Sequence, residues 1–154
     1  MTGRPYKLYH YTSRHHLEAI LSERKLKLTS SNLLEPKNPH LENGVLVDET
    51  DSYKPCLWAT DRPYFDSEKK VLIVPSIRYD KTEVRVTLLD TTSFVYWDDW
   101  AKENKMNPSW RRRFIKGTNY SHWWISEQEY LLIRDTAIIE YRPDIARELP
   151  PIIL

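Results

Sequence analysis

Glycine is scarce in this sequence. The chain has 154 residues and three glycines, Gly3, Gly44 and Gly117, which lie far apart. Phosphate-binding loops of the P-loop and dinucleotide-binding types need several glycines within a few residues, because the backbone must approach the phosphate closely. The sequence therefore excludes both loop types, and a nucleotide bound by this chain is held in another way.

Cysteine, long apolar runs and an excess of one charge are also lacking. Cys56 is the single cysteine, which excludes an intramolecular disulfide and a cysteine-rich zinc site. We expect no metal site, because no His-Glu-x-x-His motif is present. No apolar stretch is long enough to cross a bilayer, and Met1–Lys7 lacks an apolar signal segment, so we expect a cytoplasmic protein. The 23 Lys and Arg residues nearly balance the 22 Asp and Glu residues, which argues against a broadly polycationic nucleic-acid binder.

Large apolar side chains are numerous enough for one hydrophobic core. Six Trp and ten Tyr accompany the aliphatic residues, and hydrophobic residues make up 40% of the chain. No linker, repeat or low-complexity segment divides the sequence. Residues 1–154 are therefore predicted to form a single domain, which we expect to be a monomer.

Short alternating segments and apolar stripes predict a mixed α+β fold. A first helix is expected after Thr12 or Ser13, because Leu17, Ile20 and Leu21 recur at helical spacing. Further helices are predicted over residues 98–105 and 108–116. Strands are predicted over residues 6–11, 25–29, 56–60, 83–89, 94–96 and 123–126.

The remaining segments are predicted from their turn residues. Residues 30–54 are polar and interrupted by prolines and Asn43-Gly44, which predicts a long loop. Residues 71–79 are predicted to form an edge strand or loop, because Pro75 interrupts them. Residues 130–133 and 137–141 are predicted to form the two arms of a hairpin. The proline-rich tail is expected to act as a closing strap.

The first candidate site is Tyr9-His10-Tyr11-Thr12-Ser13, where a strand ends and a helix begins. A histidine at such a junction can present its ring in a cleft. Neutral imidazole donates one hydrogen bond and accepts another, which suits the hydroxyl pair of a ribose. The alternative is a surface histidine between packing tyrosines.

Two acidic residues, Glu127 and Glu129, form a second candidate. Two carboxylates two residues apart on an extended segment point to the same face. The alternative is a solvated turn between strands. Aromatic residues form a third candidate: Trp58 and Tyr64 could stack on a planar or cationic ring, and core packing is the alternative for Trp58.

A basic and aromatic segment forms the fourth candidate. Such a mixture suits the binding of single-stranded nucleic acid, because cations meet the backbone and aromatic rings meet the bases. The alternative is the solvated face of an amphipathic helix. The residues concerned, within 110–123, are Trp110, Arg111, Arg112, Arg113 and Lys116.

In chain order, these pieces resemble the ADP-ribosyltransferase family. Residues 9–13 and their helix resemble the His motif of the diphtheria-toxin-like and poly-ADP-ribose-polymerase-like branch. Residues 126–133 resemble the Glu-x-Glu loop and following strand of the arginine-modifying branch. The resemblance implies an α+β fold with a split antiparallel β-sheet and flanking helices, which binds NAD in a cleft without a glycine-rich loop.

The resemblance also implies a cofactor site. His10 would bind the adenosine ribose of NAD, and the Tyr11 backbone would meet the nicotinamide amide, with Thr12 completing the motif. Tyr64 would stack on the nicotinamide, and Trp58 would line the same site. The His-motif branch usually has two well-placed tyrosines after the histidine. In this chain, Tyr64 is the single candidate for such a tyrosine.

The resemblance finally implies a reaction. Glu129 would be the catalytic glutamate, bonding the 2′-hydroxyl of the nicotinamide ribose, and Glu127 would orient or deprotonate the acceptor. The expected function is that of an NAD-dependent mono-ADP-ribosyltransferase, which releases nicotinamide and modifies a protein or nucleic acid, as small toxins and effectors of this family do. The Glu-x-Glu branch begins with arginine and has a Ser-Thr-Ser strand, for which residues 58–60 are a partial substitute, so the acceptor stays open. Alternatives are a non-catalytic single-stranded nucleic-acid-binding module and an NAD glycohydrolase.

Overall fold

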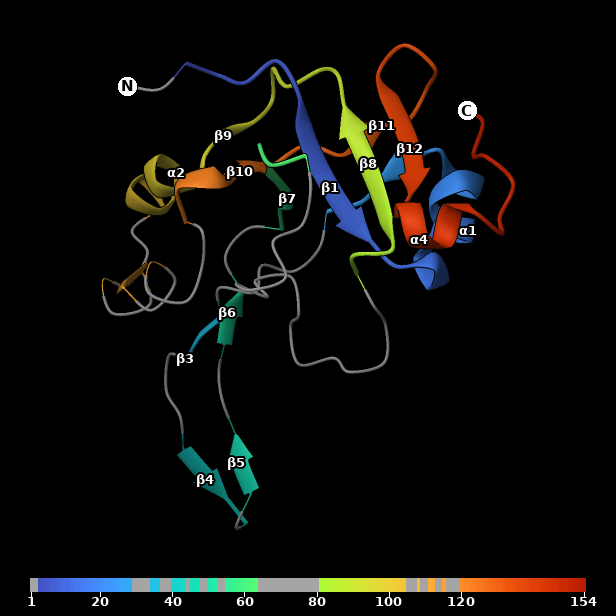
Figure 1. Ribbon diagram of the computed structural model, residues 1–154. Helices are drawn as coiled ribbons and strands as arrows, with labels where there is room; N and C mark the ends of the chain where they lie inside the picture. Colours follow the sequence, from blue (N-terminus) through green and yellow to red (C-terminus); the bar gives the residue numbers. More distant parts are fainter. Residues whose placement is uncertain are drawn as a thin grey trace.

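The centre of the fold is a six-stranded antiparallel sheet (Figure 1). The computed structural model describes residues 3–28, 34–36, 40–43, 45–47, 50–52, 55–63, 81–104, 108, 111–112, 115 and 120–154. The strand order is β12-β8-β1-β7-β10-β9. The bounds are β1 Leu8–Thr12, β7 Leu57–Thr60, β8 Val84–Leu88, β9 Val95–Tyr96, β10 Trp123–Ser126 and β12 Ala137–Tyr141. The predicted α+β class is confirmed.

The sheet consists of two halves that touch at one residue pair. Strand β8 pairs with β1 and with β12 over five positions each, and β10 pairs with β7 and β9. Between β1 and β7, in contrast, Tyr9 opposite Thr60 is the single pair in register. The sheet is therefore paired least extensively between β1 and β7, where the two halves meet.

Each of the two longer helices packs against its own hydrophobic cluster. Helix α1 (Arg14–Glu23) places Leu17, Ile20 and Leu21 against the larger core, which includes Leu8 and Val86. Helix α2 (Trp97–Glu103) contributes Trp97 and Trp100 to a second cluster with residues 123 and 125 of β10. The two helices lie at opposite ends of the sheet in Figure 1.

The first helix begins and ends where the sequence predicts. Ser13 is the N-cap residue, and Arg24 ends the helix with a φ of 53°. Strand β2 (Lys25–Leu26) follows and pairs with β11 (Tyr130–Leu131). The predicted strand over 25–29 is thus present in its first residues.

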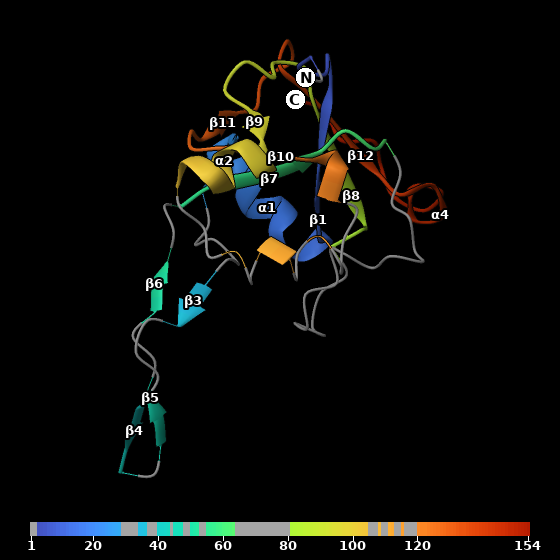
Figure 2. The ribbon, with the colours of Figure 1, turned by 90° about the vertical axis from the view of Figure 1, so that its left-hand side faces the viewer.

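The prediction of a loop over residues 30–54 is wrong. Four short strands occur there: β3 (Leu34–Pro36), β4 (His40–Glu42), β5 (Val45–Val47) and β6 (Thr50–Ser52). They form two antiparallel pairs that project away from the sheet in both ribbon views (Figures 1 and 2). Asn43 has a φ of 52° between β4 and β5. Asn-Gly favours such a hairpin turn, a signal that the polar composition concealed.

The predicted hairpin of residues 130–133 and 137–141 is also wrong. Strand β11 pairs with β2, whereas β12 pairs with β8. The Thr136 hydroxyl donates to the Leu131 carbonyl at 2.7 Å and redirects the chain between them. Alternation identifies a strand but not its partner: Tyr130 and Ile139 belong to the same core, yet their strands join different sheets.

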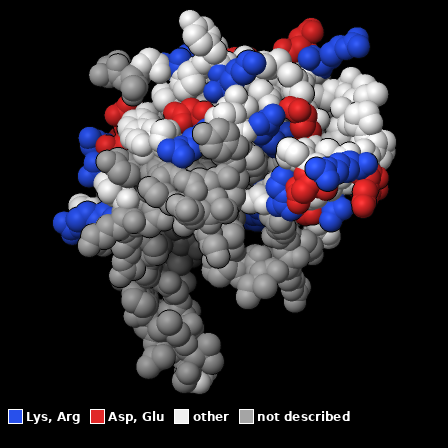
Figure 3. Space-filling model, viewed as in Figure 1, with Lys and Arg blue, Asp and Glu red and all other residues white. Residues whose placement is uncertain are grey.

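The C-terminal segment closes over the larger core. Helix α4 (Pro143–Ala146) follows β12, and Ile152 and Leu154 then pack against that core. Of the predicted helix over 108–116, Pro108, Arg111, Arg112 and Ile115 are helical, while its other residues lie outside the described part, as does the segment 71–79. The described helices include none that is long and apolar enough to cross a membrane. Acidic and basic residues alternate over the described surface seen in Figure 3.

Truncating a leucine should lower the free energy of unfolding strongly where the leucine is buried and only slightly where it is exposed. Leu88 is fully buried in β8, whereas Leu131 is 59% exposed. We expect Leu88→Ala to lower the free energy of unfolding by about 2–5 kcal/mol, because it leaves a cavity. The matched Leu131→Ala should cost less than about 1 kcal/mol. Urea unfolding measures both, and equal losses would contradict this core assignment.

Candidate functional site

His10 lies where the two half-sheets part. Its Nδ1 is 2.8 Å from the backbone carbonyl of Trp58 in β7. A carbonyl can only accept, so Nδ1 carries the proton and Nε2 keeps a lone pair. Burial lowers the pKa of His10 below its usual 6.5, the charge of Lys81 adds to the effect, and the bond to Trp58 opposes it. His10 is therefore a neutral imidazole with an accepting Nε2, to which no described residue hydrogen-bonds.

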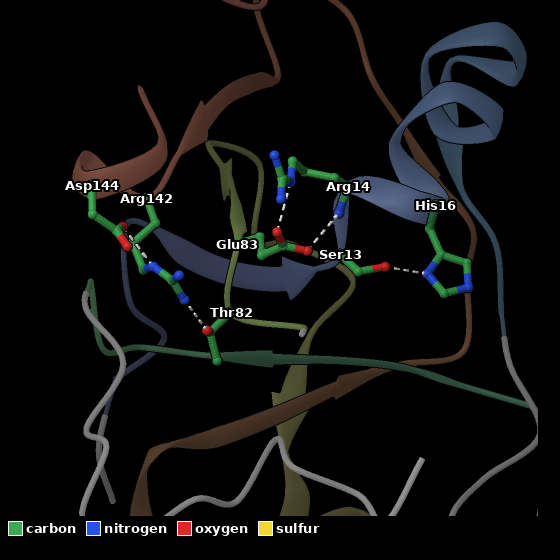
Figure 4. Close-up of polar contacts among 7 residues, drawn as sticks. All are labelled: Ser13, Arg14, His16, Thr82, Glu83, Arg142 and Asp144. Carbon is green, nitrogen blue, oxygen red and sulfur yellow. Dashed lines mark hydrogen bonds and ion pairs between the residues drawn. The ribbon is translucent and has the colours of Figure 1, made fainter. Parts of the chain in front are cut away.

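The helix that follows His10 is fixed by its first residues. The fully buried Ser13 hydroxyl lies 2.7 Å from His16 Nδ1 (Figure 4). Burial lowers the pKa of His16, and the nearby His15 and Lys81 lower it further. Neutral His16 thus accepts a hydrogen bond from the Ser13 hydroxyl. In the usual side-chain cap, that hydroxyl would instead bond a backbone N–H of the helix.

A polar clamp ties this junction to β8 and β12. The backbone N–H and Nε of Arg14 both donate to the Glu83 carboxylate, at 3.3 and 2.6 Å. Arg142 donates from its backbone to the Glu83 carbonyl and from its guanidinium to Thr82 and Asp144 (Figure 4). These contacts hold the C-terminal end of β1, and hence His10, in one position.

Tyr11 points to the opposite face from His10, as neighbours on a strand do. Its hydroxyl donates to the Arg62 carbonyl at 3.0 Å, and burial raises its pKa to about 12. The backbone of Tyr11 stays beside His10, so the role expected of that backbone is compatible with the structure. Thr12 is buried at the end of the strand, on the same face as His10.

Of the two aromatic candidates, Trp58 lies within the described residues and Tyr64 does not. Trp58 packs edge-on against Trp123, with ring centroids 6.0 Å apart, at the margin of the second core. This placement fits the core-packing alternative for Trp58. Tyr64 lies outside the described residues.

Glu127 and Glu129 belong to a turn rather than to an extended segment. The Gln128 N–H donates to the Ser126 hydroxyl at 3.1 Å, which bends the chain after β10. Glu127 Oε1 accepts from the Trp100 indole at 2.9 Å, whereas Glu129 forms an ion pair with Lys25 at 3.1 Å. The bend fits the alternative of a solvated turn between strands, because the Ser126 side chain competes for the backbone.

His10 and this turn lie at the same end of the sheet. Both β1 and β10 run antiparallel to β7, so their C-terminal ends lie beside the start of β7. The His10 ring contacts Trp58, and Ser126 lies opposite Leu57. The topology thus places the two motifs, which are more than 100 residues apart in the sequence, toward the same end of the sheet.

The basic candidate is partly neutralised. Arg111 donates to both oxygens of Asp98, at 2.5 and 3.0 Å, and Lys102 also pairs with Asp98. These hydrogen bonds hold the pKa of Asp98 below its usual value. Arg112 is exposed, while Trp110, Arg113 and Lys116 lie outside the described residues.

A polar network that sequence analysis missed joins the ends of β7 and β10. His122 closes the short helix η1 (Tyr120–His122), and its Nδ1 is 2.7 Å from Asp61 Oδ1. Its Nε2 is 3.1 Å from Arg62 Nη2, and the Trp124 indole also reaches Asp61. Both His122 nitrogens are satisfied, so the network fixes the strand ends beside Thr60. The two ends are 61 positions apart, and the sequence carried no local signal for the contact.

Comparison with protein-family models, curated proteins and solved structures finds no match for this chain. Within the described part, no three His, Cys, Asp or Glu side chains gather as metal ligands would. The geometry of the chain itself therefore has to carry the functional argument.

Mild acid should destabilise the fold through two histidines whose pKa is lowered by folding. His10 and His16 both have a lowered pKa in the folded state, so the unfolded chain binds protons first as the pH falls through 6.5. We expect the free energy of unfolding to decrease between about pH 7.5 and 5.5. His10→Gln, which keeps an N–H for the Trp58 carbonyl but does not titrate, should reduce this decrease. Urea titrations at several pH values test it, and an unchanged slope in the variant would argue against a buried neutral His10.

Proposed function

We propose that this protein is an NAD-dependent mono-ADP-ribosyltransferase, with an ADP-ribosyltransferase-like fold. The supporting observation is the position of His10, in the split between two half-sheets and at the same end as the Glu127–Glu129 turn. The family that the sequence resembles binds NAD at such a split. One dinucleotide could then contact both motifs.

NAD binding relies on the neutral imidazole. His10 Nε2 is an acceptor of fixed orientation, because Nδ1 donates to Trp58. An adenosine-ribose hydroxyl can donate to it, and no glycine-rich loop is needed. The clamp between Arg14 and Glu83 keeps the imidazole in place before the ligand arrives, so little ordering is left for binding to accomplish.

The chemistry is assigned to Glu129. Its carboxylate is half-exposed at the turn and paired with Lys25. In the reaction, the bond between the nicotinamide nitrogen and ribose C1′ breaks, and its electron pair leaves with nicotinamide. A carboxylate bonded to the ribose 2′-hydroxyl stabilises the positive charge that develops on the sugar. The acceptor then forms its bond to C1′ and loses a proton, which Glu127 takes in this proposal.

The acceptor is a macromolecule in this proposal, with water as the alternative outcome. The binding-module hypothesis has no comparable support, because Arg111 is already neutralised by Asp98. We therefore propose no second function.

Removal of the catalytic carboxylate should abolish turnover. We expect Glu129→Gln to lower the kcat for nicotinamide release by about 100-fold or more, because the amide cannot offer a full negative charge to the transition state. The matched control Glu148→Gln changes another exposed glutamate, in the C-terminal segment, and should have wild-type activity. Labelled NAD, with a cell extract separated into protein and nucleic acid, measures release and transfer. A wild type that releases no nicotinamide would refute the proposed function.

Loss of the imidazole should weaken NAD binding more than chemistry. We expect His10→Phe to raise the KM for NAD about five- to tenfold, the range that one lost hydrogen bond explains. His15→Phe, the same change at an exposed neighbouring histidine, should leave the KM unchanged. Circular dichroism confirms folding of both variants, and equal KM values would remove His10 from the site.

A further inference from the structure

The buried side chain of Trp100 holds Glu127, the first residue of the Glu127–Glu129 turn. Its indole N–H donates to Glu127 Oε1 at 2.9 Å, across 27 positions of sequence. The indole is 3% exposed and packs in the second core with Trp97 and Ile125. A rigid, buried donor thus meets a carboxylate on an exposed turn.

The end of α2 holds Trp100 in turn. The backbone N–H and the side-chain amide of Asn104 both lie 2.9 Å from the Trp100 carbonyl. Trp100 therefore has its backbone fixed at the helix end and its ring fixed in the core. Glu127 follows the last residue of β10 directly, and the bond from the indole restricts the rotamers of its side chain.

We propose that Trp100 is a positioning residue, which orients the Glu127 carboxylate toward the acceptor in the transfer step. This inference rests on the proposed function. The Trp100 indole binds one carboxylate oxygen and so restricts the orientation of the group. The acceptor proton passes to Glu127 as the acceptor forms its bond to ribose C1′. A carboxylate that is already oriented reaches the geometry for this transfer more often, which raises the rate. Trp100 itself touches neither NAD nor acceptor.

The test compares two identical substitutions in one helix. Trp100→Phe removes the donor and keeps most of the packing, whereas Trp97→Phe disturbs the same core at a residue that is fully buried. With labelled NAD and a total cell extract as acceptor, we expect Trp100→Phe to lower the kcat of transfer about tenfold, with an unchanged KM for NAD. Trp97→Phe should lie within about twofold of the wild type.

A double-mutant cycle separates positioning from folding. In the Glu127→Ala background, Trp100→Phe should have no further effect on transfer, because the residue that it orients is gone. Additive losses, or equal losses in both tryptophan variants, would show a merely structural role and overturn the inference. Nicotinamide release without transfer by the wild type would also overturn it while leaving NAD cleavage in place. No release at all would overturn the proposed function as well.

Discussion

The contact between His10 and the Trp58 carbonyl is the constraint on which this structure depends. The half-sheets share one pair in register, so the β7 edge beyond that pair needs another partner for its backbone. A buried carbonyl without a donor costs stability, and the imidazole supplies that donor at 2.8 Å. The same bond fixes the tautomer of His10 and leaves Nε2 as the accepting nitrogen. In our proposal, this nitrogen binds the adenosine ribose.

The remaining parts of the site follow from how the half-sheets are held. Arg14 and Glu83 secure the end of β1, while Asp61 and His122 secure the opposite ends of β7 and β10. The separate core of α2 then supplies the indole that holds Glu127. Each half-sheet therefore contributes one motif from a rigid base. This division suits a ligand with two ends, since each half can recognise one ribose.

Local patterns in the sequence predicted the elements but not their partners. The stripe of Leu17 and Ile20 located α1, and alternation located β8, because both depend on neighbouring residues. The partners of β11 and β12 were missed, since short apolar strands do not encode which edge they join. For Glu127 and Glu129 the sequence left an extended segment and a solvated turn open, because the Ser126 hydroxyl bond to Gln128 is invisible in a hydropathy pattern. The contact of Trp100 with Glu127 needs the packed α2 and could not be foreseen.

A crystal structure of Glu129→Gln with NAD tests the central claim most directly, because the variant should bind the dinucleotide without cleaving it. Our account predicts one NAD across the split, with an adenosine-ribose hydroxyl within hydrogen-bond distance of His10 Nε2. The nicotinamide ribose should lie beside residue 129. A dinucleotide bound away from the split, or no binding at saturating NAD by a folded protein, would contradict it.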